Sequence, residues 1–312
     1  MRSRAAGLLL GLAADRVLGD PARWHPVAGF GRLATALERV TYADARRAGA
    51  WHTALLVGGT VAVGVVTERS ARGRPVLHAT TTAAATWTVL GGTSLGREAR
   101  AVHGLLAADD LAGARRRLTH LVGRDPSTLD ARGVARAVVE SVAENTSDAV
   151  VAPLLLGAVA GVPGLLGYRA ANTLDAMVGH RTRRLERFGW ASARLDDALN
   201  LPGARLAGAL TVVLAADRRG AVRSWRRDAA AHPSPNAGVV EASFAGALGL
   251  RLGGTTTYAS GVEERPTLGD GRDPGPADIV RATRLAGRVQ LGAGLVSAAI
   301  ALRPRLPRRR HH

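Results

Sequence analysis

The sequence contains no cysteine and no lysine, so all 42 of its Lys and Arg positions are Arg. Without cysteine, disulfides, thiolate nucleophiles and zinc–thiolate sites are excluded together. Aromatic residues make up only 4% of the chain. Nucleic-acid binding usually needs a basic face with aromatic side chains for base stacking. Because the Arg residues are scattered through the polar loops among Asp and Glu, the net charge of +17 does not indicate a nucleic-acid partner.

The common phosphate-binding glycine motifs are also missing. The sequence has neither the G-x-x-x-x-G-K-[ST] loop nor the dinucleotide-binding G-x-G-x-x-G pattern. No His-x-x-x-His or Cys/His spacing indicates a zinc site. If this chain binds a nucleotide, other groups must hold the phosphates.

Long uncharged runs organise what is present. Residues 48–67, 75–96 and 149–168 each give about 20 positions without Asp, Glu or Arg, the length that a helix needs to cross a bilayer core. Their many small residues suit close packing of membrane helices. A soluble all-α protein with buried Ala-rich helices is the alternative. We favour an all-α, multi-pass integral membrane protein with large polar helical loops, forming a single domain over 1–312. Its expected membrane segments number about four to six and lie at 5–18, 48–67, 75–96, 149–171, 204–216 and 289–302.

The polar loops read as helical with Gly and Pro punctuation. Leu105–Val122 and Leu129–Val142 have apolar residues at helical spacing. Thr255–Pro276 is rich in Gly, Pro and Thr and is predicted as an irregular loop. No alternating pattern predicts a sheet. His311 and His312 end an Arg-rich tail and belong either to an expression tag or to the natural terminus.

Carboxylates at helical spacing stand beside the apolar segments. Glu140, Glu144 and Asp148 fall at i, i+4 and i+8 and would share one face of a helix. Such like charges repel unless a cation lies among them. Mg²⁺ with a nucleotide is one interpretation, since this ion is held by one or two carboxylates plus phosphates. A solvated face balanced by neighbouring Arg is the other. Asp196 and Asp197 admit the same two interpretations.

Five strings in order resemble the successive motifs of one known family. They are GDPARWHPV, ESVAENTSDAVVAPL, NTLDAMVGHRTRRLERFGWASARLDDALN, HPSPNAGVVEASFAGALGLRLGG and RPTLGDG, and they extend from about Gly7 to Pro274. The family is adenosylcobinamide-phosphate synthase, the CobD/CbiB group of cobalamin biosynthesis proteins. Two local departures, at Val239-Val240 and at Leu201-Pro202-Gly203, affect loop shape only.

The resemblance implies an ATP-dependent acid–amine ligase in the cell membrane, with its active site facing the cytoplasm. Its substrates would be adenosylcobyric acid, (R)-1-amino-2-propanol O-phosphate and ATP with Mg²⁺, and its product adenosylcobinamide phosphate. Membrane lipid and other late cobalamin-pathway membrane enzymes are the implied partners.

Amide formation of this kind needs a metal held by carboxylates, cationic groups for phosphate and a base for the ammonium proton. The candidate metal or base residues are Glu144, Asp148, Asp175, Asp196 and Asp197, with Asp196 and Asp197 as the first choice for Mg²⁺. Guanidinium groups match phosphate bidentately. The candidate phosphate- and substrate-binding residues are Arg181, Arg194, Arg265, Asn145, Asn172 and Asn236.

Two other functional classes stay open. A Mg²⁺-dependent membrane prenyltransferase also places Asp-rich motifs at helix edges. A non-catalytic membrane subunit or permease would need a polar path, yet the long runs contain no acidic residue or Arg.

The order of the motifs raises a question of sidedness. If residues 149–168 formed one straight span, Glu144 and Asp175 would lie on opposite sides of the membrane. Val162-Pro163-Gly164 carries a turn signal past the middle of this run. We therefore expect a re-entrant hairpin or a sharply broken helix, whose turn is buried in protein and whose two ends lie on the cytoplasmic side.

Overall fold

The structure is a computed structural model that describes residues 1–20, 25–123, 125–180, 182–258 and 261–303. Over this part of the chain it is helical, with one small two-stranded sheet. The helices are α1 (Arg2–Leu18), α2 (Pro26–Thr41), α3 (Arg46–Ser70), α4 (Pro75–Val89), α5 (Gly92–Ala107), α6 (Leu111–Leu118), α7 (Ala131–Thr146), the π-helix η1 (Ser147–Val151), α8 (Ala152–Ala160), α9 (Val162–Val178), α10 (Trp190–Leu214), α11 (Arg218–Asp228), the 3₁₀ turn η2 (Ala229–Ala231), α12 (Ala237–Leu248) and α13 (Pro276–Leu302).

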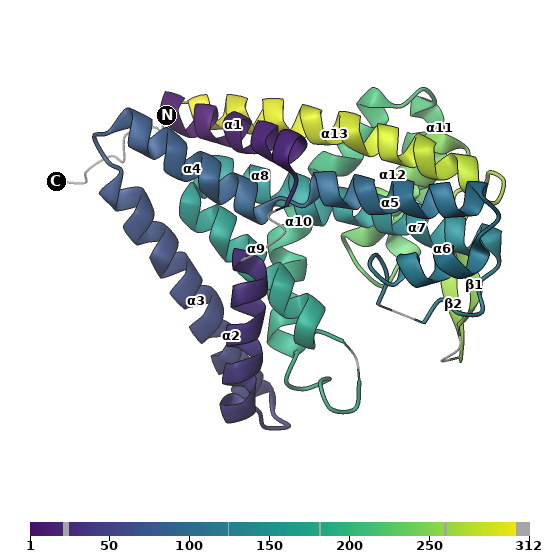
Figure 1. Ribbon diagram of the computed structural model, residues 1–312, viewed down its shortest axis with the longest axis horizontal. Helices are drawn as coiled ribbons and strands as arrows, with labels where there is room; N and C mark the ends of the chain where they lie inside the picture. Colours follow the sequence, from purple (N-terminus) through teal and green to yellow (C-terminus); the bar gives the residue numbers. More distant parts are fainter. Residues whose placement is uncertain (21–24, 124, 181, 259–260, 304–312) are drawn as a thin grey trace.

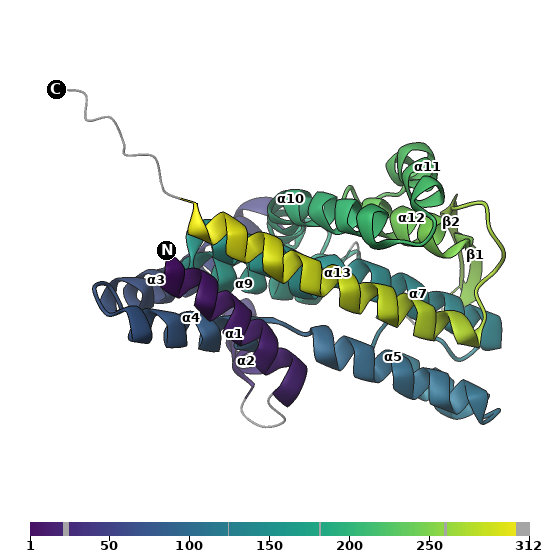
Figure 2. The same ribbon diagram turned by 90° about the horizontal axis from the view of Figure 1, so that it is seen from above.

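The long helices lie side by side around α13. Figure 2 shows α13 running nearly the whole length of the molecule, with α1 along one flank and α10 along the other. Figure 1 shows the polar helices α6 and α11 gathered at one end with α5 and the apolar helix α12, while the N-terminus and the last turn of α13 lie at the opposite end. The core joins both parts, because buried side chains from α1, α7, α12 and α13 belong to one cluster. The all-α prediction is confirmed apart from the sheet.

Polar helices begin at Asp caps. The carboxylates of Asp110 and Asp130 each accept a hydrogen bond of 2.7 Å from the backbone N–H three residues later, at Gly113 and Gly133, which satisfies a first-turn donor. The cap at Asp110 makes the prediction of one helix over 105–122 wrong. The chain ends α5, turns through Asp109 at φ 56°, and starts again as α6.

The expected break in 149–171 is present. The chain runs as a continuous helix through α7, η1 and α8 to Ala160, turns at Gly161 with φ +76°, and returns as α9, which contacts α8. The turn precedes the position suggested by the sequence, because Pro163 fits the first turn of α9, where its missing N–H costs nothing. The two ends of this segment therefore lie on the same side of the turn.

A buried ion-pair network holds the turn. Glu68 at the end of α3 pairs with Arg4 Nη2 at 2.5 Å and with His78 Nε2 at 3.0 Å. Its other oxygen accepts from the Val162 N–H at 3.0 Å, while Arg4 also donates to the Ala158 carbonyl at 3.3 Å. The network thus caps the last turn of α8 and the first turn of α9 together.

We expect Gly161→Ala to destabilise the protein far more than Gly73→Ala. Both glycines have a positive φ, so each Ala costs about 1–2 kcal/mol of left-handed backbone strain. A Cβ at Gly73 meets nothing within 4 Å, whereas one at Gly161 meets the paired groups of Glu68 and Arg4. Displacing that partly buried pair adds a further cost at Gly161 that Gly73 does not have. Thermal unfolding in detergent measures the difference, and equal melting temperatures for the two variants would contradict it.

The predicted irregular loop over 255–276 is wrong in its first half. Strands β1 (Leu252–Tyr258) and β2 (Gly261–Leu268) form an antiparallel pair with a register shift between Leu252 and Gly254. β-Branched residues favour strands even when Gly and Pro stand among them. The strand sequences show no apolar/polar alternation, and Leu252 and Leu268 at the base of the hairpin are buried in the core.

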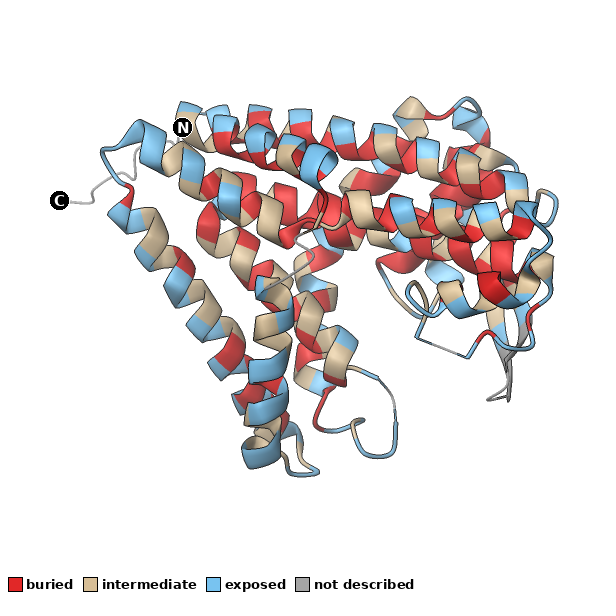
Figure 3. Ribbon diagram, viewed as in Figure 1, coloured by how far each residue is buried: buried red, intermediate tan, exposed pale blue. Residues whose placement is uncertain are grey.

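Two helices of the described chain, α3 and α13, are long and apolar enough to cross a membrane by length and composition. A buried core helix of a soluble protein passes the same test, but only 28% of the apolar window of α3 is buried. Figure 3 shows exposed and half-exposed positions along most of α3. Its four large apolar side chains with more than half of their surface exposed are Trp51, Leu55, Val63 and Val66.

The exposed face of α13 changes character along its length. In its first half the exposed positions are Ala277, Arg281, Arg284 and Arg288. In its second half they are Leu291, Leu295, Ala299 and Leu302. The change falls at the start of the predicted membrane segment 289–302.

Candidate active site

Carboxylates from four helical elements, two before the α8–α9 turn and two after it, come close together. Glu144 ends α7, Asp148 lies in η1, Asp175 is near the end of α9 and Asp196 is in the second turn of α10. Each is close enough to at least one of the others to affect its ionisation. We call these four residues the acidic cluster.

A π-turn orients the carboxylate of Asp148. The five residues of η1 interrupt the α-helical hydrogen bonding, a distortion often found at functional sites. Ser147 Oγ then donates to Asn200 Oδ1 at 2.9 Å, and Asn200 Nδ2 donates to Asp148 Oδ1 at 2.5 Å. Asn200 of α10 therefore fixes Asp148 from the neighbouring helix.

The acidic cluster is short of positive charge. Asp196 is 7% exposed, and its Oδ1 is buried without a hydrogen-bond partner in the described part of the chain. Burial, and then the Asp175 carboxylate, raise the pKa of Asp196 to about 7. Burial followed by the Glu144 and Asp196 charges holds the pKa of Asp148 well above its ordinary value. Such a site favours a cation or protons.

A cavity of about 400 Å³ opens beside the cluster. Its charged and titratable lining consists of Glu140, Glu144, Asp175, His180 and Arg265. Glu144 and His180 are exposed, so the cavity connects the cluster to solvent. A cavity of this size holds a small ligand or part of a larger one.

The hairpin supplies the cationic wall of this cavity. Glu140 accepts a hydrogen bond of 2.8 Å from the Gly253 N–H, and Arg136 Nη1 donates to the Gly253 carbonyl at 3.0 Å. These bonds tie β1 to α7. On β2, Arg265 Nη1 lies 3.8 Å from Glu140 Oε2, so its guanidinium faces the same cavity as the carboxylates.

A further carboxylate lies buried behind the cavity. Glu241 of α12 is 2% exposed. Burial, with the Glu140 and Glu144 charges, holds its pKa well above the ordinary value. His232 Nε2 lies 3.9 Å from Glu241 Oε1. The acidic surroundings of the cavity thus extend one helix beyond the sequence-predicted residues.

The structure brings most of the predicted carboxylates together, with Arg265 on the wall of the same cavity. Asn172 hydrogen-bonds the Asp196 carboxylate. Asp197 is half-buried and close enough to Asp175 to raise the pKa of that group, after burial. Asp196, one of the two first-choice residues for Mg²⁺, interacts electrostatically with Asp197 and with Asp148 of η1.

The other predicted binding residues are placed differently. Asn145 donates to the Ser141 carbonyl of its own helix at 3.0 Å. Asn236 is buried and uses both ends of its amide, donating to the Asp197 carbonyl at 2.8 Å and accepting from Arg205 at 2.9 Å. Arg194 lies on the exposed face of α10. Arg181 is outside the described residues.

Helical spacing placed Glu140 beside Glu144 and Asp148, but it was not among the residues given a role in the reaction. Asn200 and Glu241 stand in the motif strings of the predicted residues and were also given no role, although motif membership indicated them. Arg169 follows the third uncharged run. Its charge lies within electrostatic reach of Asp148, and its Nε is buried without a hydrogen-bond partner in the described chain. Nothing in local spacing connects Arg169 to the cluster.

No group of three or more His, Asp or Glu side chains in the described ranges is arranged to hold a metal ion by protein ligands alone. The unpartnered Asp196 oxygen and the crowded carboxylates nevertheless fit a cation. This suits Mg²⁺, which takes one or two carboxylates and completes its shell with water and phosphate oxygens.

Comparison with known proteins identifies the family. The family model described as CobD/Cbib protein matches residues 8–286. The chain belongs to this family. The cobalamin biosynthesis protein CobD of Mycobacterium tuberculosis is 54% identical, over 97% of this chain and 98% of that protein. The CobD proteins of Chromobacterium violaceum and Geobacter metallireducens are 45% and 42% identical, over 95% and 91% of this chain and 96% and 92% of theirs. No solved structure matches. The family resemblance is confirmed, and this CobD-family chain is a cobalamin biosynthesis protein.

Proposed function

We propose that this CobD-family protein joins an aminopropanol phosphate to the free propionate of adenosylcobyric acid, using ATP, to give adenosylcobinamide phosphate. The observation that carries the proposal is that Glu144 and Asp175 of the acidic cluster line one solvent-connected cavity together with Arg265. Amide formation from a carboxylate and a phosphorylated amine, driven by ATP, requires such a combination of carboxylates and a phosphate-binding cation.

The reaction balances as two transfers. The propionate oxygen attacks the γ-phosphorus of ATP, so ADP leaves and an acyl phosphate forms. The neutral amine then attacks the acyl carbon, phosphate departs, and the ammonium proton goes to a base. Only the propionate arm, the triphosphate and the amine need to enter a cavity of about 400 Å³. The corrin ring then lies outside it.

The residues of the site divide these tasks. Asp148 and Asp196 would hold Mg²⁺, with Asn200 and Asn172 orienting them. When bound, Mg²⁺ would neutralise charge on the phosphate oxygens. Arg265 binds the transferring phosphoryl group, because guanidinium matches phosphate geometry. Glu144 and Asp175 line the cavity and accept the ammonium proton.

We also propose that the protein spans the cell membrane several times with this site on the cytoplasmic side. The uncharged exposed face of α3 and the Leu-bearing half of α13 support the proposal, since isolated exposed apolar residues are ordinary but continuous apolar faces are not. The α8–α9 turn keeps the acidic cluster on one side, where ATP is available. Gly161 is buried under the Arg4–Glu68 pair, as a turn within a membrane requires.

Membrane residence predicts that the intact chain stays in the membrane pellet through washes with high salt and alkaline carbonate. Detergent should release it, because apolar faces rather than surface charge hold it there. Immunoblotting of each fraction measures this. Release by carbonate alone would contradict a multi-pass protein.

The sidedness is tested with single cysteines, which the chain otherwise lacks. Ser127→Cys before α7 and His180→Cys after α9 are at exposed positions and should react with an impermeant maleimide from the same side. Gly73→Cys, in the α3–α4 connection beside the Gly161 turn, should react from the other side if α3 crosses fully. Labelling of Ser127→Cys and His180→Cys from opposite sides would separate the parts of the proposed site.

The activity is tested with purified protein, ATP, Mg²⁺, adenosylcobyric acid and aminopropanol phosphate. Mass spectrometry of the corrinoid should show the amide product, and its amount should equal the ADP formed. An unaltered corrinoid with well-folded protein would reject the proposal.

A further inference from the structure

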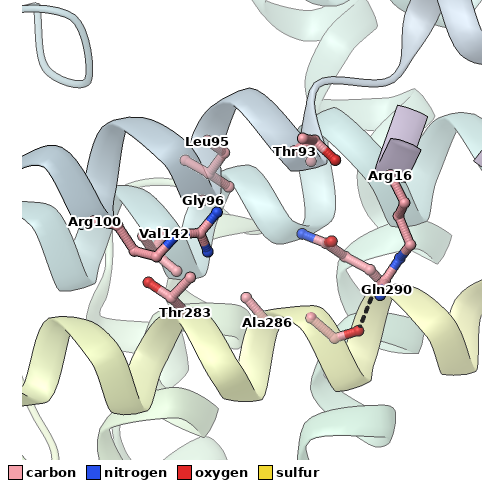
Figure 4. Close-up of a pocket in the computed structure, with 11 residues that line it drawn as sticks. Arg16, Thr93, Leu95, Gly96, Arg100, Val142, Thr283, Ala286 and Gln290 are labelled. Atoms are coloured by element: carbon pink, nitrogen blue, oxygen red, sulfur yellow. Dashed lines mark hydrogen bonds between the residues drawn. The ribbon is translucent and has the colours of Figure 1, made fainter. Parts of the chain in front are cut away.

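A second cavity, with no lining residue in common with the first, lies between α1, α5 and α13 and has a volume of about 220 Å³. Its polar lining consists of Arg16, Thr93, Arg100, Thr283 and Gln290. Figure 4 shows the Arg100 guanidinium and the Gln290 amide directed into the same space between α5 and α13. This cavity plays no part in the proposed amide-forming reaction.

Neither Arg side chain of this cavity forms an ion pair within the described chain. Arg16 Nη2 donates to the Gly287 carbonyl at 2.7 Å, and its charge also acts at longer range on the Asp15 carboxylate. Within the described residues, no hydrogen bond or ion pair engages the Arg100 guanidinium, which extends over Gly96. Asp15, the neighbouring acid, instead accepts the Thr93 N–H and hydroxyl at 3.2 and 3.0 Å. The cavity is therefore built for a negatively charged ligand.

Gln290 provides an independent sign of a missing ligand. Gln290 is only 7% exposed, and its side-chain amide makes no hydrogen bond to any described residue. Its Oε1 lies near Gly92, and its amide atoms stay open to water in the cavity rather than sealed in the core. A polar ligand that entered the cavity could therefore hydrogen-bond this amide directly.

The position of the cavity along α13 indicates the source of the ligand. The α13 residues that line it extend from Thr283 to Gln290, and the exposed face of the helix changes from Arg288 to Leu291 at this level. Arg16 of α1 is joined to α13 at the same level through Gly287. Polar groups of lipids lie where a membrane protein changes from a charged to an apolar surface.

We propose that this cavity binds the phosphate of an anionic phospholipid headgroup, with the acyl chains lying over Leu291 and Leu295. The inference rests on the membrane residence proposed above. Arg16 and Arg100 supply charge-assisted hydrogen bonds, and Gln290 supplies its amide N–H. Basic pockets between membrane helices bind anionic headgroups in this way. The bound lipid links α1, α5 and α13 at the membrane surface.

The test measures thermal unfolding of the detergent-purified protein as short-chain phosphatidylglycerol is added. The wild-type melting temperature should rise with lipid, since a ligand that binds only the folded state stabilises it. Arg100→Gln and Gln290→Leu should each weaken the apparent affinity about tenfold, a typical result of losing one charge-assisted contact or its amide partner. Arg288→Gln, which removes an exposed Arg at the same level outside the cavity, is the matched control and should respond like the wild type.

Two further titrations distinguish the possible ligands. Phosphatidylcholine of the same chain length and inorganic phosphate should each bind with an apparent affinity at least about tenfold lower than that of phosphatidylglycerol. Equal responses to the two lipids, or equal responses of Arg100→Gln and Arg288→Gln, would overturn the proposal. A stronger response to inorganic phosphate would also overturn it and indicate a site for a soluble phosphate compound. If Arg100→Gln fails to fold, Gln290→Leu decides. Neither ATP nor a corrinoid is present, so a failure of amide formation does not affect the result.

Discussion

Asp196→Asn should lower ATP-dependent product formation at least about a hundredfold, the scale of one lost main electrostatic contact, or about 2.7 kcal/mol of activation free energy. Asp196 is the buried centre of the acidic cluster, and its Oδ1 has no partner in the described chain. The amide of Asn keeps the side-chain shape but cannot balance the charge of Mg²⁺. Initial rates at saturating ATP and corrinoid measure the effect.

The same substitution should leave the protein as stable as the wild type or more stable. Burial and then the charge of Asp175 raise the pKa of Asp196. A neutral amide at this position would relieve both the cost of burying the charge and the repulsion. Functional clusters of like charge commonly reduce stability in this way. Mg²⁺ should raise the melting temperature of the wild type but not of the variant. Asp273→Asn, at an exposed carboxylate paired with Arg251, is the control and should keep normal activity. Near-normal turnover of Asp196→Asn would contradict a catalytic role for the acidic cluster and leave it with a structural role only.

Arg265→Gln should reduce kcat/KM for ATP about a hundredfold. Its guanidinium is the one that β2 places on the wall of the cavity, 3.8 Å from Glu140. Loss of this charge weakens binding of the transferring phosphoryl group more in the transition state than in the bound substrate, so kcat should fall together with kcat/KM. Steady-state rates over a range of ATP concentrations separate the two constants.

The control for this prediction lies at the base of the same hairpin. Arg251 immediately precedes β1 and pairs with Asp273 at the exposed surface, away from the cavity. Arg251→Gln should keep kcat within about twofold, because surface ion pairs contribute little. Equal losses for Arg265→Gln and Arg251→Gln would mean that the hairpin acts only as a support.

The features that could be predicted from the sequence are those that depend on local patterns, namely uncharged runs, turn signals and helical spacing. Uncharged runs located α3 and the α8–α9 segment, and the Pro–Gly turn signal indicated a break close to Gly161. The run 75–96 was predicted as one segment, but α4 ends at Val89 and the rest of the run belongs to a break and to the start of α5. The grouping of Glu144 with Asp148 followed from helical spacing, although the π-turn at η1 changes the local geometry. Residues in one motif were therefore predictable together.

The remainder depends on contacts between distant segments. Arg169 and Glu241 approach the acidic cluster only because α9 and α12 pack beside it, and no local pattern encodes those distances. For Asn236 the motif suggested substrate binding, but in the structure its side chain instead joins α10 to the chain just before α12. The hairpin was missed because its strand sequences, LGGTTTY and GVEERPTL, show no apolar/polar alternation. Gln290 stands in an apolar helix, where only the folded structure reveals its unpaired amide.

The most direct test of the central claim follows an oxygen atom. Adenosylcobyric acid with ¹⁸O in its free propionate is converted by the protein with ATP and aminopropanol phosphate. Mass spectrometry then measures the ¹⁸O content of the released phosphate and of the nucleotide. Activation of the propionate by the γ-phosphoryl group predicts one ¹⁸O in inorganic phosphate for each amide formed, with ADP unlabelled. Label in AMP, or amide formed without transfer of ¹⁸O to phosphate, would contradict the account.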